Sequence, residues 1–240
     1  MLKLISIGLK LKDITLEALE EIKSSDIVYL EGYTSLGASV NELEKLTGKK
    51  IVKLNREEVE SDKLVNEGKK KNVALLIYGD VFSATTHLSL IEGNVKIVNG
   101  ISIFTSIGRT GLSLYNFGKA ISIPFSLVKS PIDSLKENMK LGLHTLLLLD
   151  LDPINNKFLD AVAALKYLKE NKINSKIIVC SALGTENEKI VYGKIDDLIK
   201  LKFDVFPQCL IVPGKMHFME EDYLVRFEKW ENYSLVYLLY

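Results

Sequence analysis

The sequence has few cysteines, few histidines and no excess of charge of either sign. Its 240 residues include 2 cysteines and 3 histidines, and 31 basic side chains balance 31 acidic ones. The zero net charge argues against a broad surface for nucleic acid or for anionic membranes. Cys180 and Cys209 both lie inside apolar runs, which is typical of buried, reduced thiols in an intracellular protein. We therefore expect a cytoplasmic protein without nucleic-acid or membrane partners.

Long apolar runs are also missing. Residues 145–149 and 209–213 are far shorter than the roughly 20 residues that a helix needs to span a bilayer. Residues 1–11 are apolar, but they lead directly into Lys12 and Asp13. We expect this segment to form a first strand and not a signal peptide.

Several familiar catalytic signatures do not occur. The sequence has no Gly-x-Gly-x-x-Gly dinucleotide fingerprint, no Walker-type phosphate loop and no Gly-x-Ser-x-Gly nucleophile turn. His87, His144 and His217 are far apart in the sequence, and so are the two cysteines, so no metal-ligand spacing is present. We expect no metal site.

Short apolar runs alternate with amphipathic segments along the chain, which predicts an α/β architecture with parallel strands in each sheet. The expected strands are residues 2–9, 26–31, 51–54, 73–78, 95–98, 121–125, 145–149, 176–180, 188–192, 210–212 and 235–239. The expected helices are residues 15–24, 39–46, 56–70, 103–115, 132–140, 156–170 and 195–201. The alternation is interrupted at residues 116–119, so we predict two α/β domains, residues 1–113 and 114–240.

Several predicted strands end in short polar or glycine-containing turns. The most prominent one is Gly79-Asp80, which follows the apolar run 73–78 and precedes small and hydroxyl residues and His87. Others are Gly8-Leu9, Leu149-Asp150 and the turn at Gly184. Because strand carboxyl ends in α/β proteins meet at one edge, these turns could line a cleft for a small organic ligand. The alternative is that Gly79-Asp80 is ordinary turn chemistry and that Leu149-Asp150 is simply a strand end.

A series of motifs occurs in order over nearly the whole chain, and together they resemble the diphthine synthase family of tetrapyrrole-methylase-like methyltransferases. The motifs are Asp13-Ile14-Thr15, Tyr29-Leu30-Glu31, Tyr33-Thr34-Ser35-Leu36, Gly79-Asp80, Ala84-Thr85-Thr86-His87, Gly111-Leu112, residues 114–119, residues 142–146, Lys189-Ile190-Val191 with Gly193, and residues 210–215 with His217. Any one of them alone would be weak, but their combination and order are specific.

The resemblance implies two α/β domains of the tetrapyrrole methylase type with the cofactor cleft between them, in a homodimer. It implies that S-adenosyl-L-methionine is the cofactor. It also implies that the acceptor is the amino group of the 3-amino-3-carboxypropyl histidine of translation elongation factor two, whose methylation forms diphthine in diphthamide biosynthesis. Two alternatives stay open, a tetrapyrrole methyltransferase and a degenerate, non-enzymatic binding module of the same fold.

Carried over position by position, the family's cofactor contacts fall on eight residues. They are Leu9, Asp80, Ser83, Ser102, Ile103, Leu149, Gly184 and Cys209. The acceptor amine must be neutral to attack, and His87 is the candidate base that takes its proton. The alternative is that His87 only orders the loop after Asp80.

The chain departs from the family pattern at several positions. Val81 stands where the family usually has proline, and Arg109 stands where a small or apolar residue is usual. Lys10 follows the first strand, where electrostatics would not place a cation beside a cationic cofactor. Tyr33 and Arg109 are candidate contacts for the protein substrate.

Overall fold

The structure is a computed structural model that describes residues 1–84, 87–91 and 94–228. It divides into two compact units. The first unit contains residues 1–106 and 151–157, and the second contains residues 107–150 and the chain from 158 onward. The change of unit after residue 106 falls slightly before the boundary predicted at residue 113.

The first unit contains one five-stranded sheet in the order β3-β2-β4-β1-β5. Every pairing in it is parallel, as the alternation of strands and helices predicts. Its strands are β1 (Leu2–Ser6), β2 (Ile27–Glu31), β3 (Ile51–Leu54), β4 (Val73–Ile77) and β5 (Val95–Val98). β1 and β4 are buried at every residue, as expected for central strands covered on both faces.

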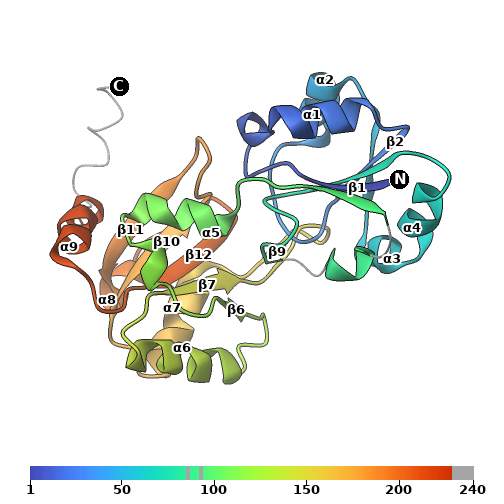
Figure 1. Ribbon diagram of the computed structural model, residues 1–240. Coiled ribbons are helices and arrows are strands. Elements are labelled where there is room, and N and C mark those ends of the chain that lie inside the picture. The colour runs from blue at the N-terminus through green and yellow to red at the C-terminus, as the bar shows by residue number, and fades with distance from the viewer. Residues whose placement is uncertain (85–86, 92–93, 229–240) are drawn as a thin grey trace. The chain divides into compact units, whose positions relative to one another are not determined.

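Helices cover both faces of this sheet (Figure 1). They are α1 (Leu16–Lys23), α2 (Val40–Thr47), α3 (Arg56–Glu60) and α4 (Lys63–Gly68), and α5 (Ile103–Ser106) follows the last strand. Ile22 of α1 and Leu43 of α2 pack into one hydrophobic cluster, whereas Val59 of α3 and Leu64 of α4 pack into the other. Local sequence sets where the helices begin, since the Thr15 hydroxyl accepts a hydrogen bond from the Ala18 amide at 3.0 Å.

The second unit contains a mixed five-stranded sheet in the order β11-β10-β12-β7-β6. Its strands are β6 (Ile121–Ile123), β7 (Thr145–Leu149), β10 (Lys176–Ser181), β11 (Lys189–Lys194) and β12 (Gln208–Val212). Only the β6–β7 pair is parallel, and the other pairings are antiparallel. The prediction of parallel strands in each sheet is therefore wrong for this unit. β10 and β11 are joined by a short turn without a helix, and such a connection allows only antiparallel neighbours.

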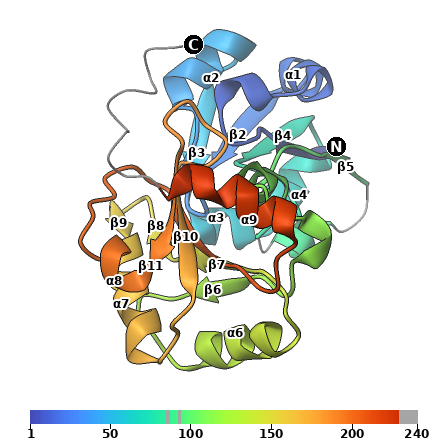
Figure 2. The same cartoon turned by 90° about the vertical axis from the view of Figure 1, so that its left-hand side faces the viewer.

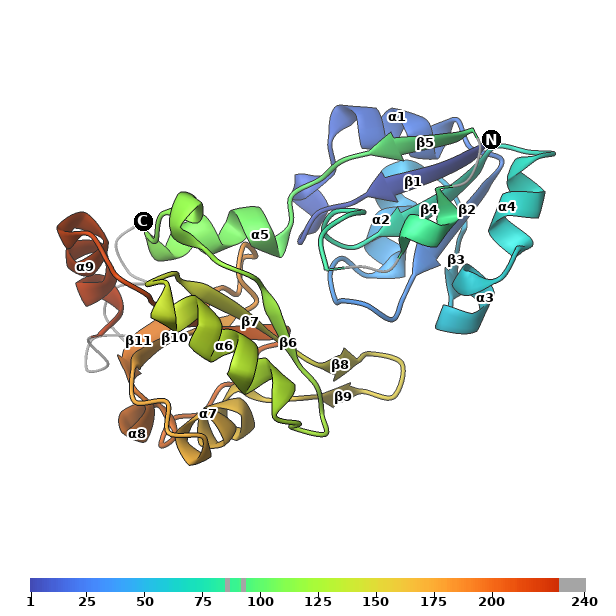
Figure 3. The same ribbon diagram turned by 60° about the horizontal axis from the view of Figure 1, so that its bottom comes forward.

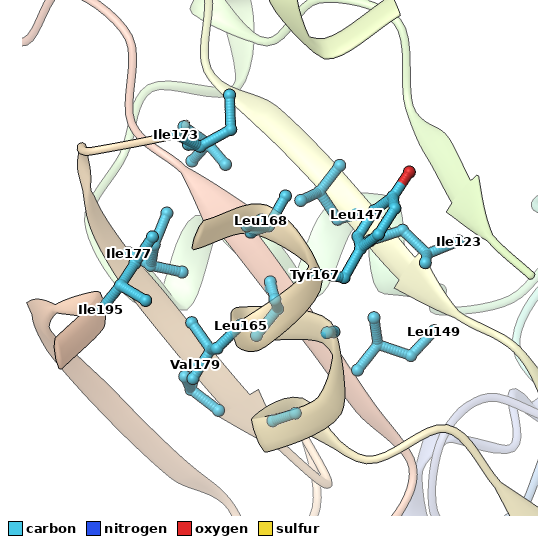
Figure 4. Packing of buried hydrophobic residues seen from close by; sticks show 14 of the residues in the cluster. Ile123, Leu147, Leu149, Leu165, Tyr167, Leu168, Ile173, Ile177, Val179 and Ile195 are labelled. Carbon is cyan, nitrogen blue, oxygen red and sulfur yellow. The ribbon is translucent and has the colours of Figure 1, made fainter. Parts of the chain in front are cut away.

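Three helices pack on one face of the second sheet: α6 (Ser130–Lys140), α7 (Ala161–Glu170) and α8 (Ile195–Leu198). Figure 2 shows them together beside β6, β7 and β10. Leu165 and Leu168 of α7 face the strand residues Leu147 and Val179, so the core of this unit lies between α7 and the sheet (Figure 4). α9 (Phe218–Leu224) follows β12 in the chain.

Several element boundaries differ from the expected ones. The helix predicted over residues 56–70 is two helices, because Ser61 has an extended backbone. The helix predicted over 103–115 is α5 followed by 3-10 turns at Ile107–Thr110 and Leu114–Asn116.

The helix predicted from residue 156 begins only at Ala161, where the Asp160 side chain caps α7. A hairpin of β8 (Leu151–Asp152) and β9 (Lys157–Phe158) precedes it (Figure 3). The strand predicted over 235–239 lies outside the described residues. Within the described part of the chain, no helix is long and apolar enough to cross a membrane.

Candidate active site

The carboxyl ends of β4, β1 and β5 meet at one edge of the first sheet, because these neighbouring strands are parallel. We call this the first strand edge. Five of the predicted cofactor residues lie in the segments that leave it, and they are Leu9, Asp80, Ser83, Ser102 and Ile103. Of the strand-end turns expected to share one edge, those at Leu9 and Asp80 lie together here, whereas those at Leu149 and Gly184 leave strands of the second sheet.

Two glycines tie the ends of β1 and β4 together. The Gly8 amide donates to the Gly79 carbonyl at 3.1 Å, and the Gly79 amide donates to the Gly8 carbonyl at 2.9 Å. Both have left-handed backbones, with φ of 72° and 74°, which L-residues with side chains rarely adopt. A Cβ added at Gly79 would meet only the Leu9 side chain, at 3.9 Å, so the space beside Gly79 is open.

Asp80 joins the ends of three strands. One carboxylate oxygen, Oδ2, accepts hydrogen bonds from the Gly100 amide at 3.0 Å, the Asn99 side chain at 3.1 Å and the Ser6 hydroxyl at 3.4 Å. The other, Oδ1, accepts from the Phe82 amide at 2.9 Å and the Ser83 hydroxyl at 3.3 Å. Burial works to raise the pKa of Asp80, but these hydrogen bonds outweigh it and hold the pKa below its ordinary value.

Both carboxylate oxygens of Asp80 are thus hydrogen-bonded to other groups of the protein, and Asp80 is only 7% exposed to solvent. Asp80 thus fixes the backbone of the first strand edge. Sequence reasoning missed its partners Ser6, Asn99 and Gly100. The available signal was Asn99-Gly100, a polar residue and a glycine directly after an apolar run, in the same relation to β5 as Gly79-Asp80 has to β4.

Leu9 and Ser102 occupy turns that are ordered by local hydrogen bonds. The Asp13 carboxylate accepts from the Leu9 amide at 3.0 Å and from the Lys10 amide at 3.3 Å. The buried Ser102 precedes α5, and its hydroxyl accepts from the Phe104 amide at 3.2 Å. Leu9 and Ile103 are half-buried, so each presents part of an apolar side chain at this edge.

Val81, which stands in place of the family's proline, is also part of this network. Its side chain is buried, and its amide donates to the Ser6 hydroxyl at 3.0 Å. A proline has no amide hydrogen and could not make this bond. The substitution therefore exchanges a rigid ring for a hydrogen bond to β1.

The other three predicted cofactor residues lie at one edge of the second sheet. Cys209 pairs in register with Leu148, the neighbour of Leu149, and Gly184 lies in the turn that leaves β10. We call this the second strand edge. Cys209 also pairs with Cys180, both are buried and free, and the hydrogen bond between the thiols together with burial raises the pKa of Cys180. The expectation of buried thiols without a disulfide is confirmed.

An ion pair and an unpartnered hydroxyl lie next to the turn that follows β10. The Gly184 amide donates to Glu188 Oε2 at 2.7 Å, and Arg109 Nε donates to the same oxygen at 2.5 Å. Ser181 Oγ is buried and has no hydrogen-bond partner among the described residues. Sequence reasoning missed Ser181, because a serine at the end of an apolar strand carries no distinguishing signal.

His87 is buried at 2% exposure. Its Nε2 atom lies 3.7 Å from Glu31 Oε2, at the carboxyl end of β2, the strand next to β4. His87 therefore belongs to the first strand edge, but this distance is beyond hydrogen-bond reach. Whether it is a base or only orders its loop stays a prediction.

His144 lies at the opposite end of β7 from Leu149, at the start of that strand. Its Nδ1 accepts from the Gly214 amide at 2.9 Å, so its Nε2 donates to Glu220 Oε1 at 3.2 Å. The motifs at 114–119, 142–146 and 210–217 meet around it. These motifs build the second unit and do not line its second strand edge.

The two strand edges have features that fit S-adenosylmethionine. The open space beside Gly79 leaves room for a ligand. The Ser181 hydroxyl, which has no partner among the described residues, could form a hydrogen bond to one. Leu9 and Ile103 are half-buried and present apolar surface at the first strand edge, whereas Leu149 is buried in the core of the second unit. Among the described residues, no group of histidines, cysteines and carboxylates could hold a metal ion.

Residues 1–199 match the sequence model of the tetrapyrrole (corrin/porphyrin) methylases. The chain belongs to this family. The tetrapyrrole methylase fold expected from the motifs is thereby confirmed, and the chain is a methyltransferase.

Within the tetrapyrrole methylases, the chain is similar to the diphthine synthases. The diphthine synthase of Methanococcus aeolicus is 41% identical over 236 residues, which cover 89% of this chain and 92% of that protein. The diphthine synthase of Methanocaldococcus jannaschii is 41% identical over 237 residues, with 88% and 92% coverage. A solved structure of a diphthine synthase has a TM-score of 0.88 at 30% identity and covers 95% of each chain. The resemblance to the diphthine synthases within this family is therefore confirmed.

Proposed function

We propose that this methyltransferase uses S-adenosyl-L-methionine to methylate the amino group of the 3-amino-3-carboxypropyl histidine of translation elongation factor two, forming diphthine. The observation that carries the proposal is the 41% identity to named diphthine synthases over nearly the full length of both chains. The order of the diphthine synthase motifs along the sequence supports the same acceptor.

We propose that both strand edges contribute to cofactor binding. Bound S-adenosylmethionine supplies an activated methyl group. Leu9, Ile103 and Leu149 would pack on its adenosyl part, and the open backbone at Gly79 and the turn at Gly184 would allow close approach. Ser83, Ser102 and Cys209 would supply further contacts from the same edges.

We propose an indirect role for Asp80 in cofactor binding, in place of the direct contact that the sequence suggested. The family resemblance placed it among the residues that contact the cofactor directly. Five hydrogen bonds from the protein already engage its carboxylate. We propose that Asp80 acts chiefly by holding Gly79, Ser83 and Gly100 in the arrangement that the ligand meets.

The two alternatives have less support. The identity of 41% is to diphthine synthases, which favours their acceptor over a tetrapyrrole. The degenerate binding module was suggested by Val81 and Lys10. The Val81 amide donates a hydrogen bond to Ser6 at the first strand edge, so this loop is ordered by the rest of the unit. This argues against a loop that has lost its binding function.

By the same resemblance, we propose that the protein is a homodimer that works in the cytoplasm. The molar mass in solution, measured by light scattering, tests the dimer. A mass close to twice 27.0 kDa is expected, and a mass of one chain would contradict it.

The function is tested by calorimetry and by methyl transfer. We expect the protein to bind S-adenosylhomocysteine and to transfer labelled methyl groups to elongation factor two that carries the 3-amino-3-carboxypropyl histidine. The unmodified factor is the control and should remain unlabelled. Binding without transfer would overturn the proposed acceptor, and the absence of binding would overturn the proposed cofactor.

A further inference from the structure

Glu31 is a fully buried carboxylate at the first strand edge. It ends β2, next to β4, and its residue is 0% exposed. Its Oε1 accepts from the Tyr33 amide at 2.8 Å and from the Thr34 amide at 2.7 Å, and its Oε2 accepts from the Thr34 hydroxyl. Glu31 therefore fixes the turn that carries Tyr33.

Two buried polar atoms near Glu31 have no hydrogen-bond partner among the described residues. They are Tyr33 Oη and His87 Nε2. The rings of Tyr33 and His87 meet edge to face, with centroids 6.2 Å apart. Folded proteins rarely leave such atoms unsatisfied. Two of them on rings in edge-to-face contact indicate a place for a polar group that the described residues do not supply.

The charge around these atoms indicates which group fits. Glu31 forms no salt bridge with a lysine or arginine in the described chain, and its one ionic neighbour is His87 Nε2, at 3.7 Å. Burial works to raise the pKa of Glu31, but His87 and the hydrogen bonds of the turn outweigh it, so the carboxyl has a lowered pKa and stays ionised. On the other side, Arg56 lies 5.3 Å above the Tyr33 ring and is paired with Glu60. The Glu31 carboxylate thus gives the cluster a negative charge.

We propose that Glu31, Tyr33 and His87 form the subsite that receives the primary ammonium group of the methyl acceptor. This inference rests on the proposed function. Tyr33 Oη and His87 Nε2 accept hydrogen bonds from the ammonium, and the Glu31 carboxylate stabilises its charge. A primary ammonium group suits such acceptors, because it has three donors and no acceptor.

The same arrangement prepares the amine to attack. One proton leaves the ammonium for His87 Nε2, which yields a neutral amine with a free electron pair and an imidazolium. The Glu31 carboxylate stabilises that imidazolium and so acts as a positioning residue. The proton later passes from His87 to water. No oxidant, reductant or metal takes part in this transfer.

Tyr33→Phe tests the subsite with the smallest change. Tyr33 Oη has no hydrogen-bond partner among the described residues, so its removal should leave thermal stability and S-adenosylhomocysteine affinity unchanged. The KM for the modified elongation factor should rise about tenfold, since a hydrogen bond to a charged group is lost. Tyr29→Phe, on the strand β2 that leads to Tyr33, is the matched control. It removes a 2.9 Å bond to Glu67 and should lower stability without changing KM.

His87→Gln tests the proton transfer. We expect kcat to fall at least tenfold with S-adenosylhomocysteine affinity retained, which also shows that the variant folds. If the KM for the acceptor is the same in Tyr33→Phe and in the wild type, the proposed subsite is wrong. Tyr33 Oη and His87 Nε2 would then bind only water. A wild-type kcat in His87→Gln would overturn the base. If the wild-type protein itself transfers no methyl group, the proposed function fails, and that outcome is distinct from either of these.

Discussion

At the scale of single residues, Asp80 has the largest structural role at the first strand edge. It connects the end of β4 to Ser6 of β1 and to Asn99 and Gly100 after β5. The sequence identified Asp80 from its position after an apolar run. It could not identify the partners, which lie 74, 19 and 20 residues away and come near only when the sheet forms.

We expect Asp80→Asn to lower the free energy of unfolding by about 2–3 kcal/mol. The amide retains the shape of the side chain but loses the charge and turns one acceptor into a donor that faces other donors. Urea unfolding followed by circular dichroism measures the change. Asp62→Asn is the control, because Asp62 is exposed and its side chain makes no capping bond. Equal stability of the two variants would contradict this role of Asp80.

Stability should also depend on pH through Asp80, Glu31 and Glu220, whose pKa values are all lowered in the folded protein. A lowered pKa stabilises the fold above the ordinary value of about 4, and this contribution is lost as the pH falls through the folded-state value. We expect the unfolding free energy to fall as the pH drops below about 4. The fall should be shallower in Asp80→Asn, and identical slopes would show that Asp80 does not contribute.

At the scale of elements, strand ends and glycines could be placed from the sequence. Gly79 lies in the turn that follows β4, where its positive φ is required, and this turn comes where the apolar run stops. The pairings of β12 with β10 and β7 could not be placed, because these strands look alike as apolar runs. Strand direction follows from which connections cross the sheet, and the sequence pattern does not record this.

Gly79→Ala and Gly48→Ala form a matched pair at this scale. Both glycines have positive φ, 74° and 68°, and neither position has an atom closer than 3.9 Å to an added Cβ. Each change should therefore cost about 1 kcal/mol of stability through backbone strain alone. Only Gly79→Ala should weaken S-adenosylhomocysteine binding in calorimetry, because its Cβ fills the open space beside Leu9. If Gly79→Ala binds S-adenosylhomocysteine with wild-type affinity, Gly79 does not belong to the cofactor site.

At the scale of the whole molecule, each unit has its own hydrophobic core and its own buried carboxylate network. In the second unit, Glu220 accepts from the Ser113 amide at 2.7 Å and from the His217 amide at 2.6 Å, and it also binds His144. These bonds join segments that are far apart in the sequence. They explain why motifs distant from the cofactor residues belong to the same pattern.

We expect Glu220→Gln to raise amide hydrogen exchange at Ser113, at His217 and along β7, because the side chain loses its charge and one acceptor. Exchange in β1 and β4 should stay as in the wild type, since Glu220 makes no bond in the first unit. Glu221→Gln, at the exposed neighbouring position, is the control. A uniform rise in exchange over both units would show that they unfold as one.

The sequence by itself determined the helices that are capped locally, the parallel first sheet, the turns at the strand ends and the family. These features depend on short-range patterns or on motif order, which the chain carries directly. Only the tertiary structure decided that Asp80 is held by its own protein, that the second sheet is largely antiparallel, and that Tyr33 and His87 share an unsatisfied position beside Glu31. The physical reason is that hydrogen bonds and buried charges depend on distances between segments, and folding sets those distances.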